Sequence, residues 1–270
     1  MDEIAVFSGA RSLDIARFAL RCYGVWLPVR RLVLIAPRHC LGELRREEFR
    51  GVTMVADEEI PGHSEVRRFL DENEAAWNRH DRSGNWYLQQ FLKLGYLATT
   101  PSRAVFVADG DTVFSRDFLS AMIRNPFRVT VKKIEPVYDN LLKHLRLAIP
   151  PCSCVANGGL FARALLPRPD ALPDWFLMVM RDHVLPGLPD VDFSEYQIMA
   201  ACWGDRIPTR PIQLFRRFDL LVSEKTENRL ETAIASALQH YDAVAIERGH
   251  ANSLIRRMAA RMLYATRYSW

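Results

Sequence analysis

The stretch Ala104-Val105-Phe106-Val107-Ala108-Asp109-Gly110-Asp111 carries the clearest structural signal in the chain. Its unbroken apolar run predicts a strand buried on both faces, because a half-exposed strand alternates polar and apolar residues. Two carboxylates separated by one glycine follow this strand. Asp and Gly are common in turns, so the tripeptide alone indicates no more than a turn. Its place directly after a buried strand makes it a candidate ligand site, since open α/β sheets bind ligands at the carboxyl ends of their strands.

The residues before this strand alternate between apolar runs and helical patterns. Strands are predicted at 4–7, 32–35 and 52–55, and helices at 13–22 and 41–49. Such alternation is typical of parallel strands joined by crossover helices. We therefore expect an α/β fold with a Rossmann-type, mainly parallel sheet flanked by helices. The other predicted elements are helices at 63–77, 86–97, 176–185 and 194–201, strands at 127–134 and 155–161, and a loop with three prolines at 166–175.

Composition is ordinary for a soluble globular protein. Of the 270 residues, 49% are hydrophobic and 25% are charged. The five cysteines are scattered, and the acidic opening Met1-Asp2-Glu3 does not resemble a secretory signal, so we expect a cytoplasmic protein. Cys152 and Cys154 lack a second pair at zinc-site spacing. A net charge of +4 does not by itself indicate a nucleic-acid partner, and none is expected.

Asp109 and Asp111 are the candidate metal ligands. Carboxylate oxygens suit Mg²⁺ and Mn²⁺, hard cations that often share their coordination with substrate phosphates. Gly110 has no side chain and would leave room for a diphosphate. A metal at this turn would neutralise the charge on a leaving nucleoside diphosphate.

The helix at 86–97 carries polar residues toward the same strand end. Gln89 and Lys93 are four residues apart and share one helix face. Lys93 could meet a donor phosphate or the Asp pair, and Gln89 or Gln90 could bind a sugar. The alternative is an amphipathic helix with these residues at its surface.

Four motifs in this order resemble a group of poorly characterised bacterial GT-A-like glycosyltransferases of polysaccharide loci. The motifs are Gly84-Asn85-Trp86-Tyr87-Leu88-Gln89-Gln90-Phe91-Leu92-Lys93-Leu94, Asp109-Gly110-Asp111, Asn157-Gly158-Gly159 and Ser194-Glu195-Tyr196. The resemblance implies a GT-A-like fold, a nucleotide-sugar donor, Mn²⁺ or Mg²⁺, and a hydroxyl acceptor. It also implies functional roles for Gln90, Lys93, Asp109, Asp111, Asn157, Gly158 and Glu195.

Further candidates have structural alternatives. Ser8, Gly9 and Arg11 follow the first strand, where Gly9 permits close approach and Arg11 could touch phosphate, but Ser8 could simply cap a helix. Asp57 could bind a base or ribose, or lie in a solvated acidic turn.

The motif Asn157-Gly158-Gly159 and the acid Glu195 also allow two interpretations each. Asn157 and Gly158 could form a backbone wall against a ligand, or a plain bulge. Glu195 could take the acceptor proton of an inverting reaction, with Ser194 as the helix cap. His63, His144 and His183 have no partner pattern and are interpreted as ordinary surface or core residues.

These observations favour transfer of a sugar from a nucleotide-sugar to a hydroxyl of a saccharide or lipid-linked acceptor. One alternative is a sugar-phosphate nucleotidyltransferase, although the N-terminus lacks the glycine-rich basic loop that such enzymes use. Another is a non-catalytic protein that binds a membrane surface or nucleic acid.

The C-terminus has a different character from the rest of the chain. We assign residues 1–245 to a catalytic domain and 246–270 to a basic amphipathic helix. Its apolar stripe, four arginines and aromatic residues suit an anionic membrane surface, which would make the protein peripheral on the inner face of the cell membrane. The alternative is that the stripe packs on the catalytic domain or on a second subunit, as in a homo-oligomer.

Overall fold

A computed structural model describes residues 1–42, 44, 51–78, 83–131, 135–217 and 227–246. The strands are β1 (Glu3–Phe7), β2 (Arg31–Ala36), β3 (Val52–Ala56), β4 (Ala104–Asp109), β5 (Thr112–Phe114), β6 (Arg128–Thr130), β7 (Gly158–Ala162), β8 (Thr209–Pro211), β9 (Leu214–Arg217) and β10 (Ala243–Ile246). The α-helices are α1 (Leu13–Trp26), α2 (Arg38–Gly42), α3 (His63–Glu72), α4 (Glu74–Asn78), α5 (Gly84–Thr99), α6 (Arg116–Arg124), α7 (Pro136–His144), α8 (Leu172–Val179), α9 (Leu185–Gly187), α10 (Glu195–Trp203) and α11 (Glu227–Ala237).

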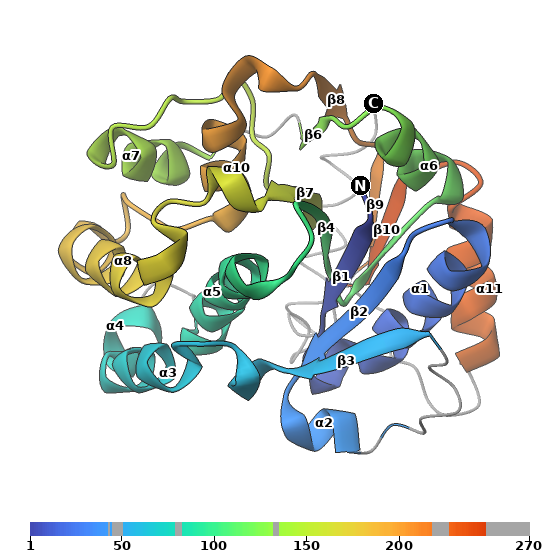
Figure 1. Ribbon diagram of the computed structural model, residues 1–270, viewed down its shortest axis with the longest axis horizontal. Coiled ribbons are helices and arrows are strands. Elements are labelled where there is room, and N and C mark those ends of the chain that lie inside the picture. Colours follow the sequence, from blue (N-terminus) through green and yellow to red (C-terminus); the bar gives the residue numbers. More distant parts are fainter. Residues whose placement is uncertain (43, 45–50, 79–82, 132–134, 218–226, 247–270) are drawn as a thin grey trace, which may run out of the picture.

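The central sheet has the strand order β3-β2-β1-β4-β7, with helices on both of its faces (Figure 1). Strands β1 to β4 run parallel, whereas β7 pairs antiparallel with β4. Because successive strand side chains point to opposite faces, continuous apolar strands require cover on both sides. The mainly parallel α/β sheet predicted from the sequence is therefore confirmed.

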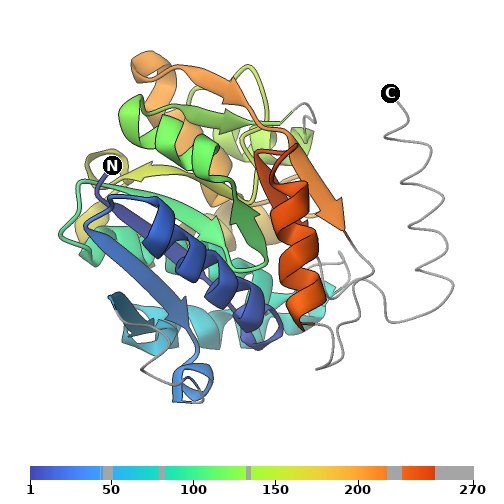
Figure 2. The same cartoon turned by 90° about the vertical axis from the view of Figure 1, so that its right-hand side faces the viewer.

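Two hydrophobic cores cover the sheet. Ala5 and Phe7 of β1 face one core, which also contains residues of α3, α5, α8 and α10. Ile4 and Val6 face the other core, built with α1, α6, α11 and β10. Helices α1 and α11 lie side by side (Figure 2), and Arg21 forms an ion pair with Glu231 between them.

The carboxyl ends of the parallel strands meet at one edge of the sheet. Phe7 at the end of β1 is in register with Asp109 at the end of β4. The chain just beyond them is held by backbone hydrogen bonds, from Ser8 N to Ile35 O at 2.9 Å and from Gly110 N to Phe7 O at 2.7 Å. This edge brings together the turns after β1, β3 and β4.

Several predictions for the second half of the chain are wrong in extent. Within the strand predicted at 127–134, the structure describes the short β6, which pairs with β8 outside the central sheet, and residues 132–134 lie outside the described residues. The strand at 155–161 begins only at Gly158, and the loop at 166–175 already contains the start of α8 at Leu172. The helix predicted at 41–49 lies mostly outside the described residues. These segments are shorter and less periodic than the N-terminal elements, so local pattern determines their ends poorly.

The pair Asn157 and Gly158 begins β7 in a tightly packed position. Asn157 adopts a left-handed backbone with a φ of 56°. A Cβ on Gly158 would lie 2.3 Å from Cζ of Phe114. Packing against an aromatic ring therefore requires a glycine at 158, and its predicted contact with a ligand stays a prediction.

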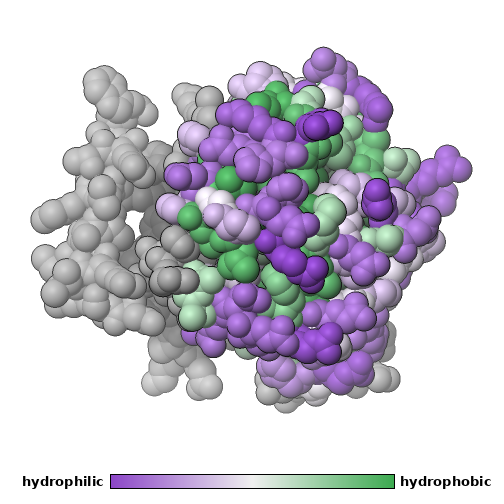
Figure 3. All heavy atoms as spheres, turned by 90° about the vertical axis from the view of Figure 1, so that its left-hand side faces the viewer, coloured by the Kyte–Doolittle hydropathy of each residue, from purple (hydrophilic) through white to green (hydrophobic). Residues whose placement is uncertain are grey.

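The described part of the chain ends at the last strand. Ile246, placed by the sequence at the start of the C-terminal helix, ends β10, and residues 247–270 lie outside the described residues. Within the described part of the chain, no helix combines the length and apolar character needed to cross a membrane. On the side that carries α8, hydrophilic surface surrounds smaller apolar areas (Figure 3).

A substitution that adds a single methyl group tests the packing of Gly158. Gly158→Ala forces a displacement of Phe114, and such overpacking costs about 1–3 kcal/mol, which lowers the melting temperature. Gly24→Ala is the matched control, because its Cβ would lie 3.5 Å from Leu32 Cδ1, an ordinary contact. Alanine within α1 is expected to hold or raise the melting temperature. Equal melting temperatures for Gly158→Ala and the wild type would contradict this account.

Candidate functional site

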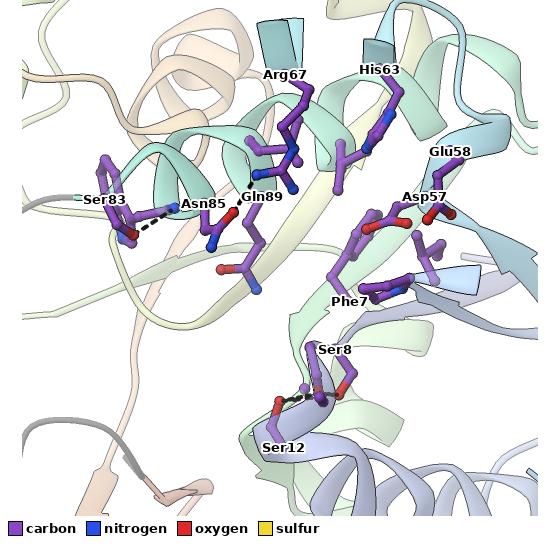
Figure 4. Close-up of a pocket in the computed structure, with 18 of the residues that line it drawn as sticks. Phe7, Ser8, Ser12, Asp57, Glu58, His63, Arg67, Ser83, Asn85 and Gln89 are labelled. Atoms are coloured by element: carbon purple, nitrogen blue, oxygen red, sulfur yellow. Dashed lines mark hydrogen bonds between the residues drawn. The ribbon is translucent and has the colours of Figure 1, made fainter. Parts of the chain in front are cut away.

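A cavity of about 620 Å³ opens at the carboxyl edge of the sheet. This size falls in the range typical of small-molecule sites. Figure 4 shows its walls, which come from the turn after β1, the start of α3, the turn after β3 and the first half of α5. Of the residues predicted from the sequence, it brings together Ser8, Gly9, Asp57, Gln89, Gly110 and Asp111.

One wall of the cavity is formed by the turns after β1 and β4. The hydroxyl of Ser8 hydrogen bonds to that of Ser12 at 3.0 Å, and Ser12, not Ser8, occupies the N-cap position of α1. A Cβ on Gly110 would lie 2.6 Å from Cβ of Ser8. Contact between the two turns is therefore sufficient reason for a glycine at 110, and space for a diphosphate stays a prediction.

The acid at the end of β3 is buried. Asp57 is only 6% exposed, so the alternative of a solvated acidic turn is wrong. Burial, followed by the hydrogen bond and negative charge of Glu58, raises the pKa of Asp57 to about 7. Hydrogen bonding to Asp57 contributes to a lowered pKa of Glu58, against the effect of desolvation. The carboxyl of Asp57 thus keeps its proton to higher pH than an ordinary aspartate.

Helix α3 contributes a histidine and an arginine whose place at the cavity sequence reasoning missed. His63 and Arg67 are four residues apart, so both face the cavity from one side of the helix. Burial, followed by the charge of Arg67, lowers the pKa of His63. The guanidinium of Arg67 also donates to Asn85 Oδ1. The four-residue spacing was the available signal, but His63 had been interpreted as an ordinary residue.

Helix α5 supplies the next wall. It begins at Ser83, whose hydroxyl accepts a hydrogen bond from Trp86 N at 3.3 Å. Asn85, Trp86 and Gln89 then face the cavity. Gln89 therefore occupies the face that the sequence allowed for either Gln89 or Gln90.

Lys93 lies beneath the cavity in a buried polar cluster. Its side chain is 1% exposed, and its Nζ lies 2.6 Å from Glu195 Oε1 and forms a second ion pair with Asp109 Oδ1. Tyr196 completes the cluster: its hydroxyl accepts from Lys93 at 3.3 Å and donates to Asp109 Oδ1 at 3.1 Å. The sequence prediction that Lys93 could meet the Asp pair agrees with this geometry, at Asp109.

The charges in this cluster are unequal, with one ammonium for two carboxylates. Burial alone would lower the pKa of Lys93, but Asp109 and Glu195 raise it, so the ammonium is retained. Burial raises the pKa of Glu195 to about 7 against the opposing effect of Lys93, whose charge is shared with Asp109. With its amide nitrogen turned toward Glu195, Gln90 donates to Oε1 at 3.1 Å.

Asp111 is held separately from Asp109. Thr112 donates its hydroxyl to Asp111 Oδ1 at 3.0 Å, and Asn157 Nδ2 donates to Thr112 Oγ1 at 3.2 Å. The backbone carbonyl of Asn157 also accepts from Asp109 N at 2.9 Å. Asn157 thus supports the turn from behind.

The sequence candidates fall into two groups. Six candidates line the cavity, namely Ser8, Gly9, Asp57, Gln89, Gly110 and Asp111, whereas seven others do not. The residues outside the lining are Arg11, Gln90, Lys93, Asp109, Asn157, Gly158 and Glu195. Arg11 is exposed, Asp109 is intermediate, and the rest of this group lie within or behind the buried cluster.

The residues present fit a divalent cation only in part. No group of three or more His, Cys, Asp or Glu side chains in the described ranges is arranged to hold a metal. Asp111 nevertheless presents a carboxylate to the cavity, and Mg²⁺ is commonly held by one or two carboxylates together with substrate phosphates. The site therefore suits a metal that arrives with a phosphorylated ligand.

By sequence, the chain matches no protein-family model and no curated protein. Its structure is similar to that of an active-site variant of LgtC, with a TM-score of 0.50, 8% sequence identity, and coverage of 97% of this chain and 95% of that chain. Galactosyltransferase LgtC with donor and acceptor sugar analogues gives a TM-score of 0.49 at 9% identity, covering 97% and 94%. Mouse xyloside xylosyltransferase 1 gives 0.44 at 12% identity, covering 93% and 98%.

Such low identities bear on the fold alone. The likeness to the LgtC variant extends over nearly the whole of both chains. Together with the mainly parallel sheet and its flanking helices, it identifies a GT-A-type fold. The fold expected from the sequence motifs is thereby confirmed.

The raised pKa of Asp57 makes the stability of the folded protein depend on pH. Between about pH 4 and 7 the folded protein retains a proton that the unfolded chain, with an ordinary Asp pKa of 3.8, releases. Wild-type stability therefore falls as the pH rises through this window. Asp57→Asn cannot titrate, so its melting temperature relative to the wild type should rise over the same window and level off on either side. Paired thermal melts in a pH series measure this, and a constant difference would contradict the buried, protonated Asp57.

Proposed function

We propose that this protein is a metal-dependent glycosyltransferase that transfers a sugar from a nucleotide-sugar to a hydroxyl of a saccharide or lipid-linked acceptor. The observation that carries the proposal is the cavity at the carboxyl edge of a GT-A-type sheet, with Asp111 facing into it. Ligands of open α/β sheets bind at this edge. The motif order supports a relationship to the GT-A-like enzymes of polysaccharide loci.

The donor diphosphate belongs at the turns after β1 and β4. Asp111 would hold Mn²⁺ or Mg²⁺ at the Asp109-Gly110-Asp111 turn, together with phosphate oxygens. When bound, the metal would neutralise the charge that develops on the leaving nucleoside diphosphate. Ser8 and Gly9 border the same space, where backbone atoms can approach a ligand closely.

The remaining walls suit the organic parts of a donor. Asp57, with Glu58 and His63 beside it, offers hydrogen-bonding groups for a base or ribose. Trp86 presents an aromatic ring and Gln89 an amide, a combination that suits the mixed apolar and hydroxyl surface of a sugar.

The surroundings of Glu195, which the sequence offers as the base for the acceptor proton, favour a supporting role. It is fully buried and 2.6 Å from Lys93, outside the cavity lining. A base that takes a proton from an acceptor must reach it within hydrogen-bond distance. We therefore assign Glu195 to the support of Lys93 and leave the proton acceptor among the groups that face the cavity.

Two alternatives differ from this proposal in their reaction. A sugar-phosphate nucleotidyltransferase would release pyrophosphate from a nucleoside triphosphate and a sugar phosphate. A non-catalytic membrane-surface or nucleic-acid-binding protein would leave a nucleotide-sugar unchanged. Attachment of the C-terminal segment to an anionic membrane remains a prediction for residues outside the described part of the chain. It would bring the cavity close to a lipid-linked acceptor.

The proposal predicts metal-dependent consumption of a nucleotide-sugar. Incubation with a panel of nucleotide-sugars should release the nucleoside diphosphate from at least one donor, in a reaction that EDTA stops and Mn²⁺ restores. Asp111→Ala should lower this rate by roughly a hundredfold or more, the scale of several kcal/mol of lost charge stabilisation. Asp117→Ala on the exposed face of α6 is the control. Release of pyrophosphate from a nucleoside triphosphate and a sugar phosphate would instead identify a nucleotidyltransferase.

A further inference from the structure

We propose that helices α3 and α5 form an acid-binding subsite inside the cavity, where Arg67, together with His63 and Asn85, binds an anionic oxygen group carried by the transferred sugar or by its acceptor. The group would be a carboxylate or a phosphate ester. This inference rests on the proposed function and specifies the class of its substrates as acidic.

The first argument is the place of the arginine in the cavity. His63 and Arg67 line the cavity from one face of α3, and Asn85 lines it from the start of α5. In Figure 4, Arg67 reaches toward Asn85, whereas Ser8 lies at the opposite side of the cavity. The donor diphosphate is assigned to the turns after β1 and β4, beside Ser8. An anion that meets Arg67 would therefore be a different group from the diphosphate.

The second argument is that the charge of Arg67 meets no acid in an ion pair within the described ranges. Its guanidinium donates to Asn85 Oδ1, an uncharged amide oxygen. A guanidinium carries five N–H donors in a planar fork that matches the oxygens of a carboxylate or phosphate. The contact with Asn85 uses part of this fork and orients it. The other donors of Arg67, and the amide nitrogen of Asn85, are then available to a ligand.

The third argument is that the acids nearest to this wall only partly offset its positive charge. Both carboxylate oxygens of Glu58 accept from the backbone N of Arg38, at 3.0 and 3.3 Å, at the first residue of α2. Burial raises the pKa of Asp57 to about 7, so part of it is uncharged at neutral pH. Burial and then the charge of Arg67 lower the pKa of His63, against the effect of Glu58. An anion beside Arg67 would gain charge-assisted hydrogen bonds.

Matched ligands test the subsite and identify which substrate carries the acid. UDP-glucuronate and UDP-glucose differ by one carboxylate on the transferred sugar. Methyl glucuronide and methyl glucoside 6-phosphate, each compared with methyl glucoside, test an acceptor, and they are measured with and without UDP. Calorimetry in the presence of Mn²⁺ gives the affinities. We expect the wild type to bind the acidic member of at least one pair about tenfold more tightly, the scale of a hydrogen bond to a charged group.

Substitutions on α3 assign this preference to Arg67. Arg67→Gln removes the charge and should bring the acidic and neutral affinities within about twofold of each other. Arg68→Gln is the matched control, because it makes the same change at an exposed residue outside the cavity lining and should keep the preference. Arg67→Lys keeps the charge without the planar fork and should keep only part of the preference. Melting temperatures show that each variant is folded, and Arg67→Lys decides if Arg67→Gln does not fold.

The results that overturn the subsite differ from those that overturn the proposed function. Equal affinities for the acidic and neutral members of every pair, in a wild type that binds UDP, would overturn the subsite alone. A preference that Arg67→Gln and Arg68→Gln lower equally would be a general effect of surface charge and would also overturn it. If the wild type binds neither UDP nor a UDP-sugar, the proposed function fails. The acceptor pairs measured without nucleotide then decide whether the subsite exists.

Discussion

The buried ammonium of Lys93 is the interaction on which the rest of the site depends. It joins α5, β4 and α10, three elements that are far apart in the sequence, through Asp109 and Glu195. An unpaired charge in this position would cost several kcal/mol, so the three elements are held in one relative arrangement. The turn after β4 inherits its position from this arrangement.

The neighbours of the cluster have complementary functions. Tyr196 covers the ammonium with its ring, at 4.5 Å from the ring centroid, and connects it to Asp109 through its hydroxyl. Gln90 lies beside Glu195, the carboxylate that shares Lys93 with Asp109, and donates to it when its amide is turned. A residue set that looked like two separate polar motifs in the sequence is therefore a single unit, with Lys93 and Gln90 from one helix and Glu195 and Tyr196 from another.

The strands of the parallel half could be predicted closely because their apolar runs are continuous and bounded by turn residues. The ends of β1, β2, β3 and β4 lie within one or two residues of the predicted ones. The candidate site was predicted less well. Residue type and spacing indicated Asp111 and Lys93, but only tertiary packing shows that Lys93 points to the interior and that His63 and Arg67 face the cavity. The packing reasons for the glycines were hidden in the same way, since Gly110 and Gly158 make room for Ser8 and Phe114.

The direction of β7 determines which part of the chain borders this edge of the sheet. Because β7 runs antiparallel to β4, Asn157, the residue just before β7, lies beside Asp109. A strand parallel to β4 would instead place the residue that follows its C-terminal end there. The irregular segment from 145 to 157 therefore reaches the ligand edge before the strand has begun. Changes of length in this segment would fall before β7 begins and would leave the register of the sheet the same, so related chains could differ here at little cost to folding.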